Sequence, residues 1–300
     1  MELIGYFAAL GAATCWAFGS MLSVGPVRQL GPIPFNALRM LMVASFLTLF
    51  LVVTNRWNMP ATEDLGTLFL SGFIGIFLGD TLLFTAVKIL GPRMAGLLFA
   101  CNAPISFAFG AWLLGEQYVW LNVVGVIGVM GGVFLAIAGR SKAGGHQWEQ
   151  TLGHSSLGIL AGFGAAFCQS MGTLLIYKIM KAGQDPIFAT MLRVWVAVIF
   201  LSLTVLSVKS LGGIGIYRQL TKRTVRQIFI SGFLGMGVGM SLLLWGVNLA
   251  SLGIVSILSA TTPIILLPLV WFFTKERPSR TSFIAAAIVV VGTSLIFVAS

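Results

Sequence analysis

The sequence predicts an all-α integral membrane protein, in which ten transmembrane helices form two inverted five-helix repeats around a central cavity. Two observations lead to this fold class: the apolar residues form long blocks, and a glycine-rich sequence motif (called a phrase below) occurs twice. Of the 300 residues, 58% are hydrophobic and 9% are charged, and the mean hydropathy is +1.00. A soluble domain carries about 25% charged residues. Most of this protein's surface therefore cannot face water.

The apolar residues form continuous blocks rather than alternating patterns. A helix of about 20 residues crosses the ~30 Å hydrocarbon layer, whereas barrel strands would be alternating segments of about 10 residues. Lipid admits only these two kinds of spanning structure. We therefore expect membrane helices at residues 3–24, 34–54, 65–87, 94–114, 120–139, 157–177, 186–208, 226–247, 253–274 and 281–299.

The second observation is an internal repeat. Residues 71–80 are SGFIGIFLGD, and residues 231–240 are SGFLGMGVGM. The likeness begins earlier in the chain, because GYFAALGAATCWAFGS at 5–20 aligns with GILAGFGAAFCQSMGT at 158–173. Further aligned pairs are Arg39 with Arg193, Pro104 with Pro263, Trp112 with Trp271 and Glu116 with Glu276. A duplication of this kind indicates one structural unit used twice.

The duplication divides the chain into a first five-helix repeat at residues 1–140, a polar linker loop at 141–155 and a second repeat at 156–300. Because five is odd, the second copy enters the membrane from the opposite side, and the halves become inverted repeats. Inverted repeats place a binding site between the halves near the middle of the bilayer, where rocking exposes it to either side in turn. This arrangement favours a transporter.

Lys and Arg residues are distributed unevenly between the two sides of the membrane. Connections after the odd-numbered spans contain Arg28, Lys88, Arg93, Arg140, Lys142, Lys209, Arg218, Lys222, Arg223, Arg226, Lys275, Arg277 and Arg280. Connections after the even-numbered spans contain only Arg56, Lys178 and Lys181. The positive-inside rule assigns the richer set to the cytoplasm. Both termini are therefore expected on the periplasmic side of the inner membrane, and the net charge of +10 reflects topology rather than a nucleic-acid partner.

With ten spans and a five-plus-five repeat, the chain resembles the drug/metabolite transporter superfamily, specifically its EamA-type exporters. The resemblance rests on the glycine-rich third and eighth spans and on the turns at Ala103–Pro104 and Thr262–Pro263. It also rests on LLGEQ at 113–117 and FTKER at 273–277, which end the fourth and ninth spans. The family pattern has an acidic residue after glycine at the end of the fourth span. The second copy departs from this pattern, because it has Lys275 at the corresponding place in the ninth span.

The resemblance implies export of amino acids or related small metabolites, while relatives carry sugar phosphates or nucleotide sugars. The sequence contains no Walker loop, no HExxH, no GxSxG and no histidine within a span, so we expect neither an enzyme nor direct ATP drive. A channel is disfavoured because the connections are too short for a re-entrant filter. Cys15, Cys101 and Cys168 lack metal-ligand spacing, so no metal and no cofactor are expected.

Ionisable residues within the spans are the most informative candidates, because a charge near the bilayer centre costs roughly 2.5–3.5 kcal/mol or more. Asp80 lies deep in the third span, and Arg39 and Arg193 lie inside the second and seventh. Asp80 has three interpretations: a structural ion pair with Arg39, a site for a substrate amine or cation, or a proton carrier during coupling. Met240 occupies the equivalent position in the second half, so the role of Asp80 is asymmetric. The arginines either anchor helix ends or attract a substrate carboxylate.

Other candidates are polar or amphipathic residues in the middle of the first, third, fourth, sixth, eighth and ninth spans, which the resemblance implies surround the central cavity. The polar and aromatic candidates for the cavity are Trp16, Ser20, Phe84, Asn102, Gln169, Thr173, Trp245, Asn248, Ser259, Thr261 and Thr262. The hinge candidates are Pro104, Pro263, Gly75, Gly79, Gly235 and Gly239. Prolines kink spans, so Pro104 and Pro263 either act as paired hinges or only shape the helices to fit the bundle. Small residues let helices approach closely, so the glycines either serve packing or let the third and eighth helices slide during alternation.

The sequence thus predicts a secondary transporter that exports amino acids or similar small metabolites by alternating access. Export of organic cations or drugs, or exchange of sugar phosphates or nucleotide sugars, are the alternatives on the same fold. One buried acid and two arginines suit amino acids, which carry both charges. The expected partners are the small solute, the lipid bilayer and, in one interpretation, protons; one chain can enclose the cavity, so it is expected to work as a monomer.

Overall fold

The computed structural model describes residues 1–138, 155–208, 211, 213–262, 264–265, 268 and 280–299. All regular structure in these residues is helical, as the sequence predicts. Stretches long and apolar enough to cross a membrane are Glu2–Leu30, Pro32–Val53, Thr62–Leu90, Ser156–Lys181, Pro186–Ser207 and Lys222–Leu249. Shorter apolar helices are Leu98–Leu113, Trp120–Leu135 and Phe283–Val298. The ten-helix inverted repeat itself stays a prediction, and almost all of the linker lies outside the described residues.

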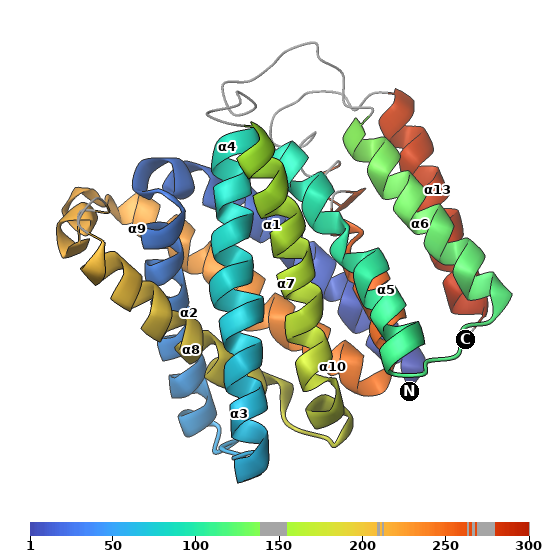
Figure 1. Cartoon of the computed structure of the whole chain (residues 1–300), viewed down its shortest axis with the longest axis horizontal. Helices are drawn as coiled ribbons and strands as arrows, with labels where there is room; N and C mark the ends of the chain where they lie inside the picture. Colours follow the sequence, from blue (N-terminus) through green and yellow to red (C-terminus); the bar gives the residue numbers. More distant parts are fainter. Residues whose placement is uncertain are drawn as a thin grey trace.

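The helices follow one another with short connections (Figure 1). In the first part of the chain they are α1 (Glu2–Leu30), α2 (Pro32–Val53), α3 (Thr62–Ser71), η1 (Gly72–Leu78), α4 (Gly79–Ala100), α5 (Asn102–Leu113) and α6 (Trp120–Ala138). In the second part they are α7 (Ser155–Lys181), α8 (Pro186–Ser207), η4 (Gly213–Gln219), α9 (Lys222–Gly232), η5 (Phe233–Gly239), α10 (Met240–Leu249), α11 (Leu252–Ser259) and α13 (Arg280–Val298).

The repeated phrase forms the same unusual structure in both places. Residues Gly72–Leu78 and Phe233–Gly239 are π-helical and connect the α-helices on either side into continuous spans. A π-helical turn contains an extra residue and is found mostly as an isolated turn, frequently at functional sites. The expectation of plain α-helical spans is therefore incomplete at both glycine-rich phrases.

Prolines mark corresponding boundaries in the two parts of the chain. Helices α2 and α8 both begin with proline, at Pro32 and Pro186, where the missing N–H costs nothing and the fixed φ suits a helix. Helix α4 ends four residues before Pro104, as expected for a residue that removes the hydrogen bond to the carbonyl at i−4. Helix α11 likewise ends at Ser259, four residues before Pro263, which itself lies outside the described residues.

Helices far apart in the sequence pack in pairs. Helix α2 packs against α8, α5 against α11 and α6 against α13, while α4 packs against α7 and α1 against α10. Figure 1 shows α6 and α13 side by side at one flank of the bundle, and both chain termini at the same end. Each of these pairs joins one helix from the first part of the chain to one from the second.

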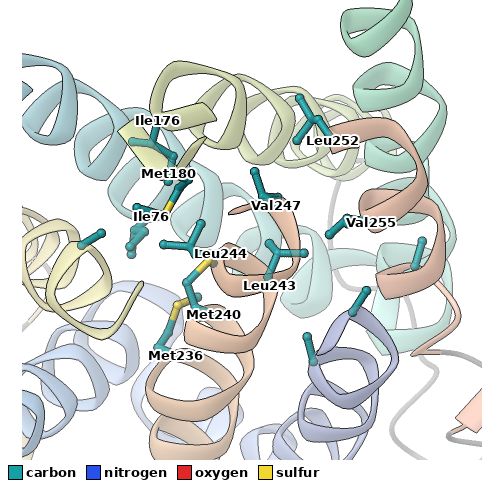
Figure 2. Close-up of a cluster of buried hydrophobic side chains, with 14 of the residues drawn as sticks. Ile76, Ile176, Met180, Met236, Met240, Leu243, Leu244, Val247, Leu252 and Val255 are labelled. Atoms are coloured by element: carbon teal, nitrogen blue, oxygen red, sulfur yellow. The ribbon is translucent and has the colours of Figure 1, made fainter. Parts of the chain in front are cut away.

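The centre of the bundle is apolar in the described part of the chain (Figure 2). Its buried side chains come from η1, α7, η5, α10 and α11, and include Ile76, Ile176, Met180, Met236, Met240, Leu243, Leu244, Val247, Leu252 and Val255. Met240, which stands where the first copy of the repeat has Asp80, is 1% exposed. The central cavity expected from the sequence stays a prediction.

The α6–α13 pair depends on glycine. A Cβ atom on Gly125 would lie 2.7 Å from the carbonyl oxygen of Gly292 and 2.7 Å from Cγ1 of Ile296. A Cβ atom on Gly131, which is also in α6, would meet nothing within 4 Å. Small residues allow close helix approach in lipid, so Gly125 faces α13 and Gly131 does not.

We predict that Gly125→Ala unfolds more easily than Gly131→Ala. Both substitutions improve helix propensity by about 1 kcal/mol, but only the first forces a methyl group into a packed contact, which costs about 1–3 kcal/mol. Thermal unfolding of both purified variants in the same micelles measures the difference. Equal stability of the two variants would show that α6 and α13 do not pack through Gly125.

Candidate functional site

A buried ion pair links α2 to α4. Nη2 of Arg39 donates to Oδ2 of Asp80 at 2.5 Å, and the two side chains are 7% and 6% exposed. Nε of Arg39 also donates to Oδ1 of Asn36 at 3.2 Å, one turn earlier in α2. The structural ion pair, one of the three interpretations of Asp80, is thus present in the structure.

Two aromatic rings enclose the same guanidinium. The Cζ atom of Arg39 lies 4.8 Å from the centroid of the Phe84 ring and 5.7 Å from that of Phe35. The two rings meet edge to face with their centroids 5.0 Å apart. Arginine over an aromatic face gains a cation–π attraction that is stronger when water is excluded. Arg39 is therefore held by a carboxylate, an amide and two rings.

Arg193, the counterpart of Arg39 in the sequence repeat, has no such surroundings. It is 0% exposed and is among the largest fully buried side chains of the described residues. Its Nε, Nη1 and Nη2 atoms have no hydrogen-bond partner in the protein. The Asp80 carboxylate interacts with it electrostatically, but without a hydrogen bond. Burying a guanidinium costs free energy because the group loses its hydrogen bonds to water. Only acceptors within the protein or on a ligand can compensate for that loss.

Each arginine packs against the glycine-rich turn of the other half. A Cβ atom on Gly232 would lie 2.8 Å from Cγ of Arg39, and one on Gly72 would lie 2.8 Å from the backbone oxygen of Arg193. A Cβ atom on Gly75 would lie 3.0 Å from Nη2 of Arg193. Side chains at these glycines would displace the arginines. Packing thus explains Gly75, one of the hinge candidates, without excluding motion there.

Trp16 is the cavity candidate that contacts a π-helix directly. Its Nε1 donates to the carbonyl oxygen of Gly235 at 2.8 Å, and a Cβ atom on Gly239 would lie 2.9 Å from the same nitrogen. Gly79 faces α7 in the corresponding way, since its Cβ atom would lie 3.4 Å from Cβ of Cys168. The three residues Trp16, Gly235 and Gly239 therefore form one contact between α1 and η5.

The remaining cavity candidates are dispersed. The hydroxyl groups of Ser20, Thr173, Ser259, Thr261 and Thr262 all donate to carbonyl oxygens three or four residues earlier in the chain. The Asn102 amide donates to the Phe99 carbonyl at 2.6 Å. Gln169 is buried, while Trp245 is 43% exposed. The Asn248 carbonyl accepts from Lys181 at 3.1 Å. The structure thus groups Arg39, Asp80 and Phe84, and does not bring these others to them.

A second polar cluster lies where the chain passes from α10 to α11. The Glu116 carboxylate accepts from the backbone nitrogens of Leu252 at 2.6 Å and Gly253 at 3.2 Å, the first two residues of α11. Nζ of Lys181 donates to the carbonyl oxygens of Asn248 and Ala250, at 3.1 and 2.9 Å, where α10 ends. An anion at a helix N-terminus and a cation at a C-terminus both complement the helix dipole. The cluster fixes the break between the two helices.

Tyr118 completes this cluster by donating to the Glu116 carboxylate and stacking on Phe107, with the ring centroids 4.1 Å apart. Burial, together with the neighbouring Glu116 carboxylate, raises the pKa of Tyr118, so its phenol stays a proton donor. Glu116 therefore anchors the N-terminus of α11.

Further contacts join the two parts of the chain at this end and at the opposite end. Arg56 and Asp185 form an ion pair of 2.8 Å, and Nε2 of Gln184 donates to the Asn58 carbonyl at 3.0 Å. At the other end of the bundle, the Tyr217 hydroxyl donates to the Pro34 carbonyl at 3.0 Å. The halves are therefore tied together at both ends in this conformation.

An apolar groove with a volume of about 340 Å³ lies on the α6–α13 pair. It is lined by Val124, Gly128, Ala287, Ile288, Val291, Gly292 and Leu295. It contains none of the residues proposed from the sequence for substrate binding, and its lining provides no polar group to hold a solute.

Together these features define a polytopic helical membrane protein with buried charged residues among its helices. The family model for the EamA-like transporter family matches residues 3–138 and 156–298. The chain belongs to the EamA-like transporter family. One crystal structure of a protein with 17% sequence identity superposes with a TM-score of 0.72, covering 97% of this chain and 96% of that chain, which shows a shared fold. No curated protein matches the sequence.

Sequence reasoning missed the surroundings of Arg39 and the lack of a partner for Arg193. Asn36 lies three residues before Arg39, a spacing that places the two side chains on one helix face, so this contact had a local signal. The orphaned guanidinium also had one: the repeat aligns Arg193 with Arg39, but aligns Met240 with Asp80. The aromatic contact of Phe35 had no signal in an apolar span.

We predict strong coupling between Arg39 and Asp80 in a double-mutant cycle. Arg39→Met and Asp80→Met each leave one buried charge unpaired, which costs about 3–5 kcal/mol, whereas the double variant removes both charges and costs less than the two single changes together. Denaturant unfolding of the four proteins in micelles measures the coupling. Additive effects would mean that the ion pair does not form in the folded protein.

Proposed function

We propose that this protein is a secondary, non-ATP transporter that exports amino acids or similar small metabolites by alternating access. Family membership indicates a membrane transporter of small molecules; the solute class and the mechanism are our proposal. The observation that carries it is the buried cluster of Arg39, Asp80 and Arg193, because ionisable groups deep in a membrane bundle mark substrate or ion pathways by default.

The architecture that we propose is ten spans in two inverted repeats, with residues 1–140 and 156–300 as the halves. Two observations support it: the family model matches two separate stretches of the chain, and α2 packs on α8, α5 on α11 and α6 on α13. Under an exchange of the halves, the α2–α8 pair and the α6–α13 pair each map onto themselves. The pairs α4–α7 and α1–α10 map onto one another.

For orientation, we propose that both termini lie on the periplasmic side of the inner membrane. Basic residues favour the other side. Arg28 lies in the last turn of α1 and Lys222, Arg223 and Arg226 lie in α9, at the end of the bundle opposite the chain termini (Figure 1).

Alternating access requires that the halves separate at one end at a time. The ties at the terminal end, Arg56 to Asp185 and Glu116 to α11, are polar contacts between the halves, and so is the tie from Tyr217 to Pro34 at the other end. Polar contacts at helix ends can exchange with water, so they can break without exposing an apolar core. We therefore assign them as the two gates.

The charge balance of the cluster favours solutes with an anionic group over organic cations, the alternative substrate. Two guanidiniums and one carboxylate leave an excess positive charge, which repels a cation that approaches the centre. An amino acid carries a carboxylate as well as an ammonium group, so it suits the cluster better.

We predict counterflow in proteoliposomes preloaded with a mixed pool of unlabelled amino acids. A carrier that reorients with bound solute should accumulate some of the labelled amino acids transiently above equilibrium, when each is added outside in turn. Liposomes without protein provide the control for leakage.

Downhill flux without transient accumulation would identify a channel instead. Flux of no amino acid would refute the solute class, and the same assay would then be repeated with sugar phosphates and organic cations.

A further inference from the structure

The unpartnered side chain of Arg193 is the strongest unexplained feature of the molecule. It is 0% exposed, and all three of its guanidinium nitrogens lack a hydrogen-bond partner in the protein. Buried polar groups are almost always paired, and each exception calls for an explanation. An arginine cannot discharge to avoid the cost, because its guanidinium keeps its proton at any ordinary pH.

The duplication shows what is missing. In the first half, α2 packs on α4, and this contact brings Arg39 to Asp80 at 2.5 Å. In the second half, α8 packs on α10 in the same way, but the position equivalent to Asp80 is occupied by Met240. One half thus provides its own carboxylate, and the other half has the arginine without the acid.

Asp80 does not serve as the hydrogen-bond partner of Arg193. Its carboxylate interacts electrostatically with both arginines, but its hydrogen bond goes to Arg39. One carboxylate cannot neutralise two guanidiniums, so the cluster retains one excess positive charge. The three residues together lack one negative charge, and Arg193 lacks oxygen atoms that could accept its hydrogen bonds.

A carboxylate from outside the protein has the chemistry to fill this shortfall. The guanidinium of arginine presents parallel N–H donors that match the two oxygens of a carboxylate, and such charge-assisted pairs are the strongest hydrogen bonds in proteins. At positions 72 and 75 of η1, glycine leaves only backbone beside Arg193, so no side chain at these two positions obstructs a carboxylate there. Elsewhere in the same contact, Phe73 and Phe77 of η1 pack on Phe200 of α8.

We propose that Arg193 binds the carboxylate of the transported solute, which occupies the place of the acid that the second half lacks. The inference rests on the proposed function and makes the solute class narrower: a small molecule with a carboxylate, of which amino acids are one kind. A solute whose only charge is a carboxylate would bring the net charge of Arg39, Asp80, Arg193 and the solute to zero. Asp80 and Arg39 then form the structural pair that positions α2 and α4 beside the site.

The test compares an acid with its amide in competition. The labelled amino acid with the largest counterflow is competed by the same unlabelled amino acid and by its C-terminal amide, which has the same shape but no negative charge. In wild-type protein the amide should inhibit about 30-fold more weakly or worse, as expected when one partner of a buried charge pair is removed. In Arg193→Met this preference should disappear, and in Arg193→Lys, which keeps the charge but loses the fork, it should be reduced.

A second pair of variants tests the site from the other side. Met240→Asp provides the missing acid within the chain and should abolish counterflow while the protein stays folded. Met240→Asn, the matched neutral control of the same size, should retain it.

The outcomes separate the inference from the proposed function. If wild-type protein transports but the amide competes as well as the acid, or if Arg193→Met keeps the preference, the carboxylate site is refuted and transport stands. If no solute shows counterflow, the proposed transport function is refuted, and the carboxylate site is tested by the melting temperature of the purified protein with amino acids and with their amides. A rise in melting temperature with the amino acids that is lost in Arg193→Met supports the site. No such rise refutes the site. If Arg193→Met does not fold, the Lys and Met240 variants decide.

Discussion

The arrangement of this protein depends on one constraint: two arginines are buried in an apolar helix bundle that offers them a single carboxylate. A charge in such surroundings needs a partner, and Arg39 has one in Asp80, with Asn36, Phe35 and Phe84 around it. Arg193 is equally buried, with its donors unpaired. An unpaired buried charge does not stabilise the fold, because apolar replacements of buried charges are often neutral or stabilising. The cost is understandable if the charge serves binding.

The same constraint accounts for the glycine-rich phrases. Each arginine lies against the π-helical span of the opposite half, Arg39 at Gly232 and Arg193 at Gly72 and Gly75. A Cβ atom at these positions would meet side-chain or backbone atoms of the arginines, so the duplicated glycines permit the close contact in both places. The contacts also join the halves at their centre, while the ties at Glu116, Arg56 and Tyr217 join them at the ends. Movement of one half against the other therefore acts directly on the surroundings of both arginines.

Composition and block length were enough to predict a helical membrane protein, since no other arrangement hides so much apolar surface from water. The scarcity of charge identified Arg39, Asp80 and Arg193, and the pairing of the first two was one of three interpretations that the sequence left open. The sequence did not predict in which direction individual side chains point, because an apolar span lacks the polar face that shows how a helix of a soluble protein is oriented. The exposure of Ser20 and Trp245, for example, was not predicted by the sequence. The π-helices at residues 72–78 and 233–239 were not predicted either, because no local pattern of residues distinguishes them from an α-helix.

The most direct measurement of the central claim compares Arg39→Met with Arg193→Met, the same substitution at two equivalent positions. Chemical denaturation of both purified proteins in identical micelles gives the two changes in the free energy of unfolding. The account predicts opposite signs: Arg39→Met destabilises because Asp80 is left alone, while Arg193→Met stabilises because an unpaired charge leaves the core. A comparable loss of stability in both variants would contradict it, since Arg193 would then have a partner within the fold.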